Sequence, residues 1–290
     1  DLDAIGSAEG VLRICKICDV PAVIAVRRDA TLAGSLINAL IAAGQEDDFI
    51  DPKGALPIIS QRTLCIVVDT YQLGLVESRE ILEKCGKVAV IDHHRKGVGF
   101  IEKADLVCHE PYASSASELV TEFLQYVGDR DDKPNRIEAE GLLSGIMLDT
   151  RDFTLHTGVR TFEAAAALRR YGAETEHVRQ LFDVSMVEYT TKARLVSEAQ
   201  MYRGCAITVS GEVAPEARVA IAQAANDLLT IQNVEASFVA VQVGGGVNIS
   251  ARSLGAVNVQ VIMESLGGGG HQTMAAAQLK HITPEAVSYT

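Results

Sequence analysis

The sequence has no tryptophan, few aromatic residues (5%) and no excess of basic residues. Lysine and arginine together number 26 against 38 aspartate and glutamate, which gives a formal net charge of −12. Proteins that track nucleic acids usually present basic patches, and those that bind single strands add aromatic side chains on which bases stack. The composition therefore argues against a long nucleic-acid surface. A small nucleotide held by metals and a few arginines stays compatible with it.

The sequence also lacks a long hydrophobic run. No apolar stretch approaches the roughly 18 residues that a membrane-spanning helix needs, and no signal peptide is visible. The six cysteines are scattered, and Cys15 with Cys18 is the one pair at C-x-x-C spacing, so a structural zinc site is not expected. We expect this chain to make no contact with a membrane. Because it begins at Asp1 without a methionine, we interpret it as a piece of a longer protein.

One segment combines a hydrophobic strand with ionisable side chains. Residues 87–91 read Lys-Val-Ala-Val-Ile, and Asp92, His93 and His94 follow directly. A buried parallel strand that delivers chemistry at its carboxyl end has this pattern. Imidazole and carboxylate ligands together suit Mn²⁺, Zn²⁺ or Fe²⁺ better than Mg²⁺ or Ca²⁺. Such a triplet alone is a weak signal, since polar residues at strand ends also form caps and ion pairs.

The same pattern recurs elsewhere in the chain. Asp69 follows the apolar segment 64–68, and Asp149 ends the apolar segment that starts at Leu142. The chain opens with Asp1 and Asp3, which would face one centre if this segment were extended, because alternate residues of a strand share a face. These acidic positions and the histidine pair are enough ligands for a site that binds two metal ions.

The order of expected elements predicts an α/β fold with two domains. Strands at 22–26, 64–68, 88–91 and 106–108 alternate with helices at 4–18, 32–43, 76–85 and 115–126, and this alternation is typical of a parallel sheet with helices on both faces. Further helices are expected at 137–148 and 161–171. We assign residues 1–182 to this domain, 183–203 to a helical connector without strands, and 204–290 to a smaller mixed α+β domain. In the latter, strands at 205–209, 236–243 and 247–252 accompany helices at 215–229 and 257–266.

Four motifs follow one another along the chain in an order that resembles the signature of the DHH phosphoesterase superfamily. They are Asp1 with Asp3, Asp69, the triplet Asp92-His93-His94, and Asp149. The glycines 267–270 followed by His271 resemble the substrate-binding motif of the associated DHHA1 domain, so the resemblance covers nearly the whole chain. Residues 110–120, which read Glu-Pro-Tyr-Ala-Ser-Ser-Ala-Ser-Glu-Leu-Val, are most similar to the GdpP-type cyclic di-AMP phosphodiesterases of bacteria. The resemblance implies a Mn²⁺-dependent phosphodiesterase that opens cyclic di-AMP to linear pApA with a metal-activated water.

The resemblance also implies roles for the acidic residues and histidines. Asp69 would bridge two Mn²⁺ ions, Asp1 would bind one of them, and Asp3, His93 and Asp149 would bind the other. His94 would contact the phosphate or the attacking water, and Asp92 would orient the two histidines. In the family a histidine precedes the position of Asp1, and nothing precedes it here. We therefore expect weak binding of the first ion and low activity of this chain.

Further implications concern substrate and location. In the second domain the glycine motif and Arg252 would bind the cyclic dinucleotide, and Ser114 and Ser115 would lie near the site. The parent protein would be anchored in the bacterial cell membrane, with this chain at the cytoplasmic face. A homodimer is compatible with the sequence. The expected substrate-binding residues are Arg252, Gly268, Gly269, Gly270, His271, Ser114 and Ser115.

Three other functions remain open. An oligoribonuclease or single-strand exonuclease of the same superfamily would hydrolyse short linear substrates, although the acidic composition does not favour it. A manganese pyrophosphatase should present a pocket rich in lysine and arginine, which Arg252 beside a glycine run does not provide. A non-catalytic sensor would bind a cyclic dinucleotide without cleaving it.

Overall fold

A computed structural model describes residues 1–28, 31–94, 99–128, 132–183, 185–213, 218–243 and 245–280. The chain divides into two compact units, Asp1–Asp183 and Val184–Thr290. We call them unit 1 and unit 2 and describe each by itself. The assignment of residues 183–203 to a connector stays a prediction.

The central sheet of unit 1 is parallel. Its strands are β3 (Leu64–Val68), β4 (Lys87–Asp92) and β5 (Leu106–His109), in that order. A second parallel pair joins β1 (Ile24–Ala25) to β2 (Phe49–Ile50). The expected parallel α/β arrangement is confirmed. Strand β2 was not expected, because two residues are too few to produce a recognisable alternation.

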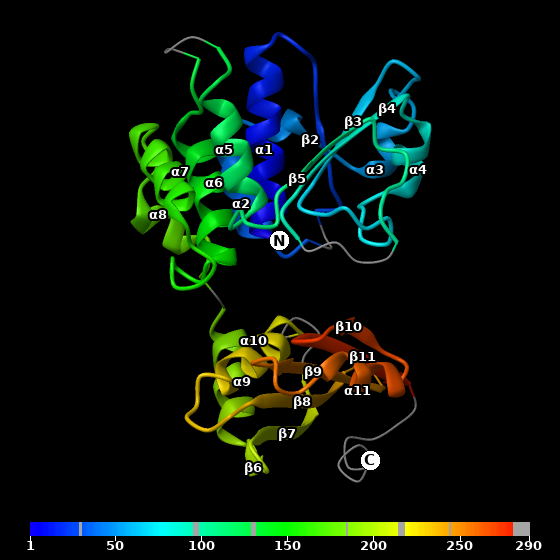
Figure 1. Ribbon diagram of the computed structural model, residues 1–290, viewed down its shortest axis with the longest axis vertical. Coiled ribbons are helices and arrows are strands. Elements are labelled where there is room, and N and C mark those ends of the chain that lie inside the picture. The colour runs from blue at the N-terminus through cyan, green and yellow to red at the C-terminus, as the bar shows by residue number, and fades with distance from the viewer. Residues whose placement is uncertain are drawn as a thin grey trace. The chain divides into compact units, whose positions relative to one another are not determined.

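The two faces of the central sheet bury alternate residues against different helices. Ile66, Val68 and Ile91 pack in a cluster with residues of α5 (Ala116–Leu124) and α6 (Arg136–Asp149). Val88 and Val90 pack on the other face with Leu82 of α4 (Arg79–Lys84). Successive side chains of a strand point to opposite faces, so helices on both faces require apolar residues at every position. Figure 1 shows α4 and α5 on opposite sides of this sheet.

The helical layer of unit 1 is built around the pairing of α1 (Leu2–Ile17) with α6 (Arg136–Asp149). A Cβ atom on Gly6 would collide with the carbonyl oxygen of Gly141, so the two backbones touch at this point. Helix α6 starts at a capping box, in which Asn135 and Glu138 satisfy each other's backbone N–H groups. The other helical segments are α2 (Gly34–Ala42), η1 (Glu46–Asp48), α3 (Pro52–Ala55), α4 (Arg79–Lys84), α5 (Ala116–Leu124), α7 (Val159–Arg170) and α8 (Thr175–Gln180).

Unit 2 is a six-stranded mixed sheet with helices packed against it, as expected for an α+β domain. The strand order is β10-β11-β9-β8-β7-β6, and β7 with β8 is its parallel pair. The expectation that residues 200–202 are helical is wrong, because they form the edge strand β6. All three residues are exposed, so they lack the alternation of buried and exposed side chains that indicates a strand. The elements are α9 (Met186–Ser197), β6 (Gln200–Tyr202), β7 (Cys205–Glu212), α10 (Arg218–Leu228), β8 (Ala236–Val243), β9 (Gly246–Ser253), α11 (Val259–Ser265), β10 (Gly269–His271) and β11 (Met274–Lys280).

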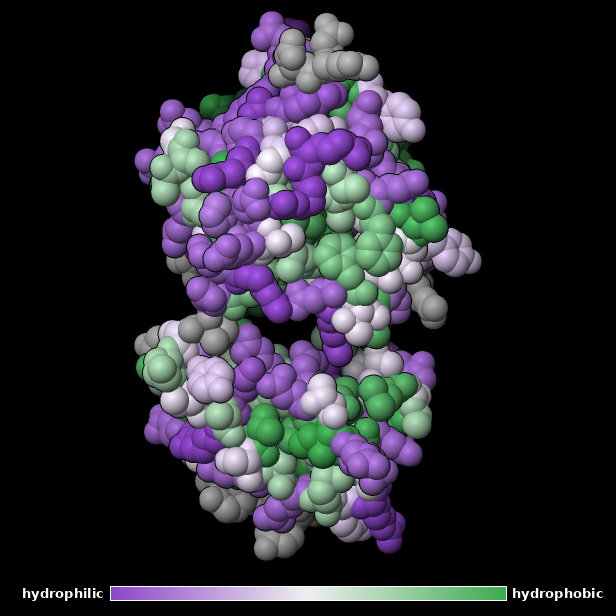
Figure 2. All heavy atoms as spheres, turned by 90° about the vertical axis from the view of Figure 1, so that its left-hand side faces the viewer, coloured by the Kyte–Doolittle hydropathy of each residue, from purple (hydrophilic) through white to green (hydrophobic). Residues whose placement is uncertain are grey.

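The surface is predominantly polar on the face of unit 1 that carries α7 and α8. Figure 2 shows hydrophilic residues over most of this face, with apolar residues in smaller areas between them. Among the described residues, no helix has the length and hydrophobicity needed to cross a membrane.

Candidate metal centre

Asp69 and His93 are each the first residue after the carboxyl end of a strand, and the two strands are neighbours in the sheet. Asp69 follows β3, and its N–H donates to the carbonyl oxygen of Ile91 in β4 (2.9 Å). Its φ of 59° places it in the left-handed region, which aspartate adopts more readily than most residues. His93 follows Asp92, the last residue of β4. The expected placement of both side chains at the same edge of the sheet is confirmed.

The expectation that Asp1 and Asp3 lie in an extended segment is wrong. Helix α1 begins at Leu2, and Asp1 is its N-cap, with a carboxylate oxygen that accepts from the N–H groups of Asp3 and Ala4 (both 3.1 Å). An N-cap carboxylate satisfies two amides that would otherwise lack partners, which favours the helix over a strand here. Asp1 and Asp3 therefore do not share a face, and a metal contact by Asp1 stays a prediction.

Asp3 is fully buried and held by the start of another helix. Its two carboxylate oxygens accept from the backbone N–H groups of Ala116 (2.7 Å) and Ser117 (2.9 Å), in the first turn of α5. The positive end of the helix dipole stabilises an ionised carboxylate at this position. This contact spans 113 residues of sequence, and no local pattern revealed it.

Helix α6 brings Asp149 to the same place. Gly145, one turn before Asp149, lies so close to α1 that a Cβ atom there would be 2.5 Å from Asp3 Oδ1 and 2.8 Å from Asp3 Cα. After Asp149 the helix ends, and Arg151, Asp152 and Phe153 all have positive φ. This tight left-handed turn is anchored by Thr150, whose side-chain oxygen accepts from the Phe153 N–H (2.9 Å).

Four side chains converge on one point. His93 Nε2 lies 3.0 Å from Asp149 Oδ2, 3.5 Å from Asp69 Oδ1 and 3.9 Å from Asp3 Oδ2. His93 Nε2 and Asp69 Oδ1 are buried, yet neither has a partner in hydrogen-bond geometry among the described residues. Lone pairs that meet without satisfied hydrogen bonds fit a cation between them. Asp3, Asp69, His93 and Asp149 form one group within metal-binding reach, and Asp69, His93 and His94 form a second that shares two members with it.

The electrostatics of this group favour a bound cation. Burial and the neighbouring Asp3 carboxylate raise the pKa of Asp69, and burial also raises the pKa of Asp149. Burial opposes the positive charge of His93, but the negative charges of the nearby Asp149, Asp69 and Asp3 carboxylates raise its pKa overall. Without a bound cation, the three carboxylates around this imidazole therefore repel one another. A divalent ion would relieve that repulsion and displace the bound protons.

His94 is positioned by Asp92. The buried Asp92 carboxylate accepts from His94 Nδ1 (2.8 Å) and from the His94 N–H (3.3 Å). A carboxylate at Nδ1 fixes the ring orientation and leaves Nε2 to face a ligand. The His94 ring is half exposed and lies 4.4 Å from the His93 ring, centroid to centroid.

Ser114 and Ser115 belong to the framework of α5. The expectation that one of them caps this helix is confirmed, since Ser115 Oγ accepts from the Glu118 N–H (3.0 Å). Ser114 Oγ donates to the buried carboxylate of Glu118 (2.6 Å), to which Thr161 also donates (2.7 Å). Both serine side chains are buried, and a contact with substrate stays a prediction.

The expected substrate-binding residues of unit 2 lie around β9 and β10. Arg252 Nε donates to Asn226 Oδ1 of α10 (3.1 Å), and its Nη1 donates to Ser250 Oγ (3.0 Å). Gly268 precedes β10, and its α-carbon lies so close to β11 that a Cβ atom would collide with Ala276. Gly269 and Gly270 are strand residues, and Gly270 has a φ of +148°. His271 ends β10, and its side chain lies outside the described part of the structure.

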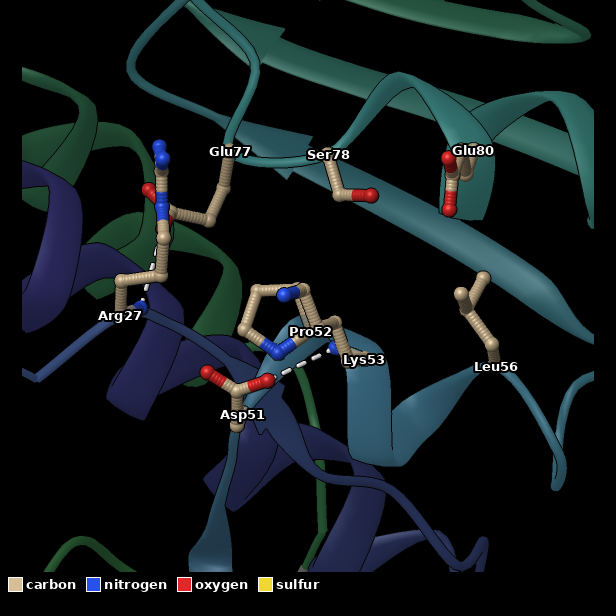
Figure 3. A pocket seen from close by; sticks show the side chains of 8 residues that line it. All are labelled: Arg27, Asp51, Pro52, Lys53, Leu56, Glu77, Ser78 and Glu80. Carbon is tan, nitrogen blue, oxygen red and sulfur yellow. Dashed lines mark hydrogen bonds and ion pairs between the residues drawn. The ribbon is translucent and has the colours of Figure 1, made fainter.

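A separate hollow of about 180 Å³ lies in unit 1 (Figure 3). Two of its acidic residues have partners: Glu77 Oε1 accepts from Arg27 Nε (2.7 Å), and Asp51 caps α3 by accepting from the backbone N–H of Lys53 (2.9 Å). None of the converging carboxylates or histidines lines it. It is therefore not part of the metal centre.

Comparison with known proteins identifies the family. Residues 1–146 match the DHH family, N-terminal domain, and residues 213–288 match the DHHA1 domain. The chain belongs to the DHH family. This DHH chain is 46% identical over 288 residues to a protein of Geobacillus thermodenitrificans named cyclic-di-AMP phosphodiesterase GdpP, and 42% identical over 288 residues to one of Listeria monocytogenes named cyclic-di-AMP phosphodiesterase PdeA. Each alignment covers 98% of the chain and 44% of the relative, so the chain spans less than half the length of these proteins.

A solved structure has the same fold. An exopolyphosphatase-related protein from Bacteroides fragilis superimposes with a TM-score of 0.82 at 20% identity, over 99% of this chain and 86% of that one. At this identity the likeness concerns the fold alone.

Proposed function

We propose that this chain is the catalytic part of a metal-dependent phosphodiesterase that hydrolyses cyclic di-AMP to linear pApA. The convergence of Asp3, Asp69, His93 and Asp149 carries the proposal, because it brings oxygen and nitrogen ligands together and leaves two of them, Asp69 Oδ1 and His93 Nε2, buried without hydrogen-bond partners among the described residues. The names of the relatives at 42% and 46% identity support the choice of substrate.

The ligand chemistry supports Mn²⁺ as the cofactor. One ion would be held by Asp3, Asp69, His93 and Asp149, and a second ion, with Asp1 among its ligands, would share Asp69. Mixed carboxylate and imidazole ligands suit Mn²⁺ better than Mg²⁺. Bound in pairs, divalent ions supply an activated water and neutralise charge on the phosphate oxygens.

The residues of the chain have distinct tasks in this proposal. The amides of α5 hold the Asp3 carboxylate in place at the centre. Asp92 holds the proton of His94 at Nδ1, so that Nε2 faces the phosphate or the attacking water. Arg252 and the glycines 268–270 would bind the dinucleotide in unit 2, and His271, Ser114 and Ser115 would be secondary contributors. The homodimer and the membrane-anchored parent stay predictions.

Product analysis tests the proposal. The chain is incubated with Mn²⁺ and, separately, with cyclic di-AMP, linear pApA or pyrophosphate, and products are separated by chromatography. We expect cyclic di-AMP to be converted slowly to pApA, and pApA to accumulate. The variant Asp69→Asn should release no product, because Asp69 belongs to both ligand groups.

Other outcomes would assign other functions. Faster consumption of linear pApA than of cyclic di-AMP would identify a nuclease. Release of phosphate from pyrophosphate alone would identify a pyrophosphatase. Tight calorimetric binding of cyclic di-AMP that persists uncleaved would identify a sensor.

A further inference from the structure

Unit 2 contains a hollow of about 600 Å³ that borders the glycine motif. This volume lies in the range of small-molecule sites. Ile221 and Ala222 of α10 contribute apolar surface, and Gly267 and Gly268 border it as well. The remaining lining residues come from the sheet: Asn248, Ile249 and Ser250 of β9, and Ala276, Ala277 and Gln278 of β11.

The polar residues of the hollow share one face of the sheet. Asn248 and Gln278 are direct cross-strand partners, so their side chains leave the sheet on the same side. Ser250 and Arg252 follow Asn248 at intervals of two residues and therefore also lie on that side. Strand β9 thus presents a carboxamide, a hydroxyl and a guanidinium in a row, and the guanidinium is fixed by Ser250 and Asn226.

Asn248 is the unsatisfied member of this row. Its carboxamide oxygen is buried and has no hydrogen-bond partner among the described residues. A buried polar atom without a partner costs about 1–3 kcal/mol, so its presence beside an open hollow calls for an explanation. A ligand that donates a hydrogen bond to this oxygen would supply the missing partner.

We propose that the hollow binds one base of the dinucleotide and that Asn248 recognises this base as adenine. The inference rests on the proposed function and adds the residue that selects the base. A carboxamide pairs with adenine through two hydrogen bonds, since its oxygen accepts from N6 and its N–H donates to N7. The same edge of guanine carries two acceptors, O6 and N7, and O6 would face the carboxamide oxygen. The base lies against the apolar surface of Ile221 and Ala222.

Equilibrium binding of linear pApA and pGpG to the whole chain tests this assignment. We expect wild type to prefer pApA, and Asn248→Ala to weaken pApA binding about tenfold, the loss expected of one two-hydrogen-bond base contact, while pGpG binding stays unchanged. Asn248→Asp keeps an acceptor for N6 but turns a second acceptor oxygen toward N7, so it should weaken pApA binding at least as much as Asn248→Ala. Gln242→Ala is the matched control, because Gln242 is a carboxamide of β8 that pairs with Val247 and therefore faces the other side of the sheet.

The outcomes separate the two proposals. If Asn248→Ala and Asn248→Asp retain the wild-type preference, or lose pApA and pGpG equally, Asn248 does not select the base and the inference is wrong, whatever the chain hydrolyses. If the preference depends on Asn248 but cyclic di-AMP is not hydrolysed, the base site stands and the proposed activity fails. Circular dichroism of each variant shows whether the fold is retained.

Discussion

Replacing Gly145 by alanine would place a methyl group between helix α6 and the Asp3 carboxylate. The new Cβ atom would lie 2.5 Å from Asp3 Oδ1 and 2.8 Å from Asp3 Cα, and it would also collide with Ser117 Oγ. Two of these three atoms belong to the aspartate that the α5 amides hold in place, and Asp3 Cα is backbone. The collision is relieved only if α6 moves away from α1, and Asp149 moves with it.

The size of the effect follows from two opposing terms. Overpacking of a buried site costs about 1–3 kcal/mol, whereas alanine in place of a helical glycine returns about 1 kcal/mol. We therefore expect a net loss of about 0–2 kcal/mol in the free energy of unfolding. Displacement of Asp3 and Asp149 should weaken Mn²⁺ binding by about 10–100-fold, the range seen when residues that support metal ligands are changed.

Gly10→Ala is the matched control on the same helix pair. A Cβ atom on Gly10 would lie 2.6 Å from Val120 Cγ1 and 2.9 Å from a methyl group of Leu142, and the ends of such side chains can rotate away. This variant introduces the same methyl group without touching Asp3. Urea unfolding in the presence of a chelator measures stability, and calorimetric titration with Mn²⁺ measures affinity. If Gly145→Ala binds Mn²⁺ as wild type does, or if Gly10→Ala weakens binding equally, the close packing at Gly145 does not position the ligands.

Three further predictions concern charge. Burial, Glu138 and Asp48 raise the pKa of Glu9 from 4.5 to about 7, so the unfolded state loses this proton first and the free energy of unfolding should fall by about 3 kcal/mol as pH rises from about 4.5 to about 7. Glu9→Gln should remove that decrease. The prediction would be contradicted if the free energy of unfolding, measured with urea, changed with pH in the same way for both proteins across this range. Because the pKa values of His93 and Asp69 are raised, Mn²⁺ should displace protons, and calorimetry in two buffers of different ionisation enthalpy should give different apparent heats; equal heats would exclude proton release. Asp69→Asn should stabilise the metal-free protein at about pH 8, where the carboxylates repel each other, and abolish the increase in melting temperature on adding Mn²⁺. A lower melting temperature of the metal-free variant would refute this account.

The sequence pattern predicted the parts of the fold that depend on local periodicity. Strand β3 and strand β8 occupy the expected ranges, because apolar residues fill every position of β3 and all but Ser237 and Gln242 of β8. Asp69 and His93 meet for the same reason, since the carboxyl ends of parallel strands lie at one edge. Strand β11 was missed because residues 274–280 contain three alanines and no β-branched side chain.

The errors and omissions near the metal centre have one local cause and one long-range cause. At Asp1, a short-range competition between capping and extension was decided in favour of the cap. The binding of Asp3 by α5 and the approach of Gly145 to Asp3 join segments more than 100 residues apart, which a single sequence does not reveal. A signal for the helix pairing was present: Gly6 with Gly10 and Gly141 with Gly145 both have the four-residue spacing that lets helices approach closely.

The four converging ligands come from four separate elements, at positions 3, 69, 93 and 149. During synthesis the chain therefore has no complete ligand set until the end of α6 has left the ribosome. A metal ion cannot template the early folding of unit 1, and it reaches a full set of ligands only when α1, β3, β4 and α6 have assembled. Occupancy of the centre by a cation would thus report that the assembly of these four elements is complete.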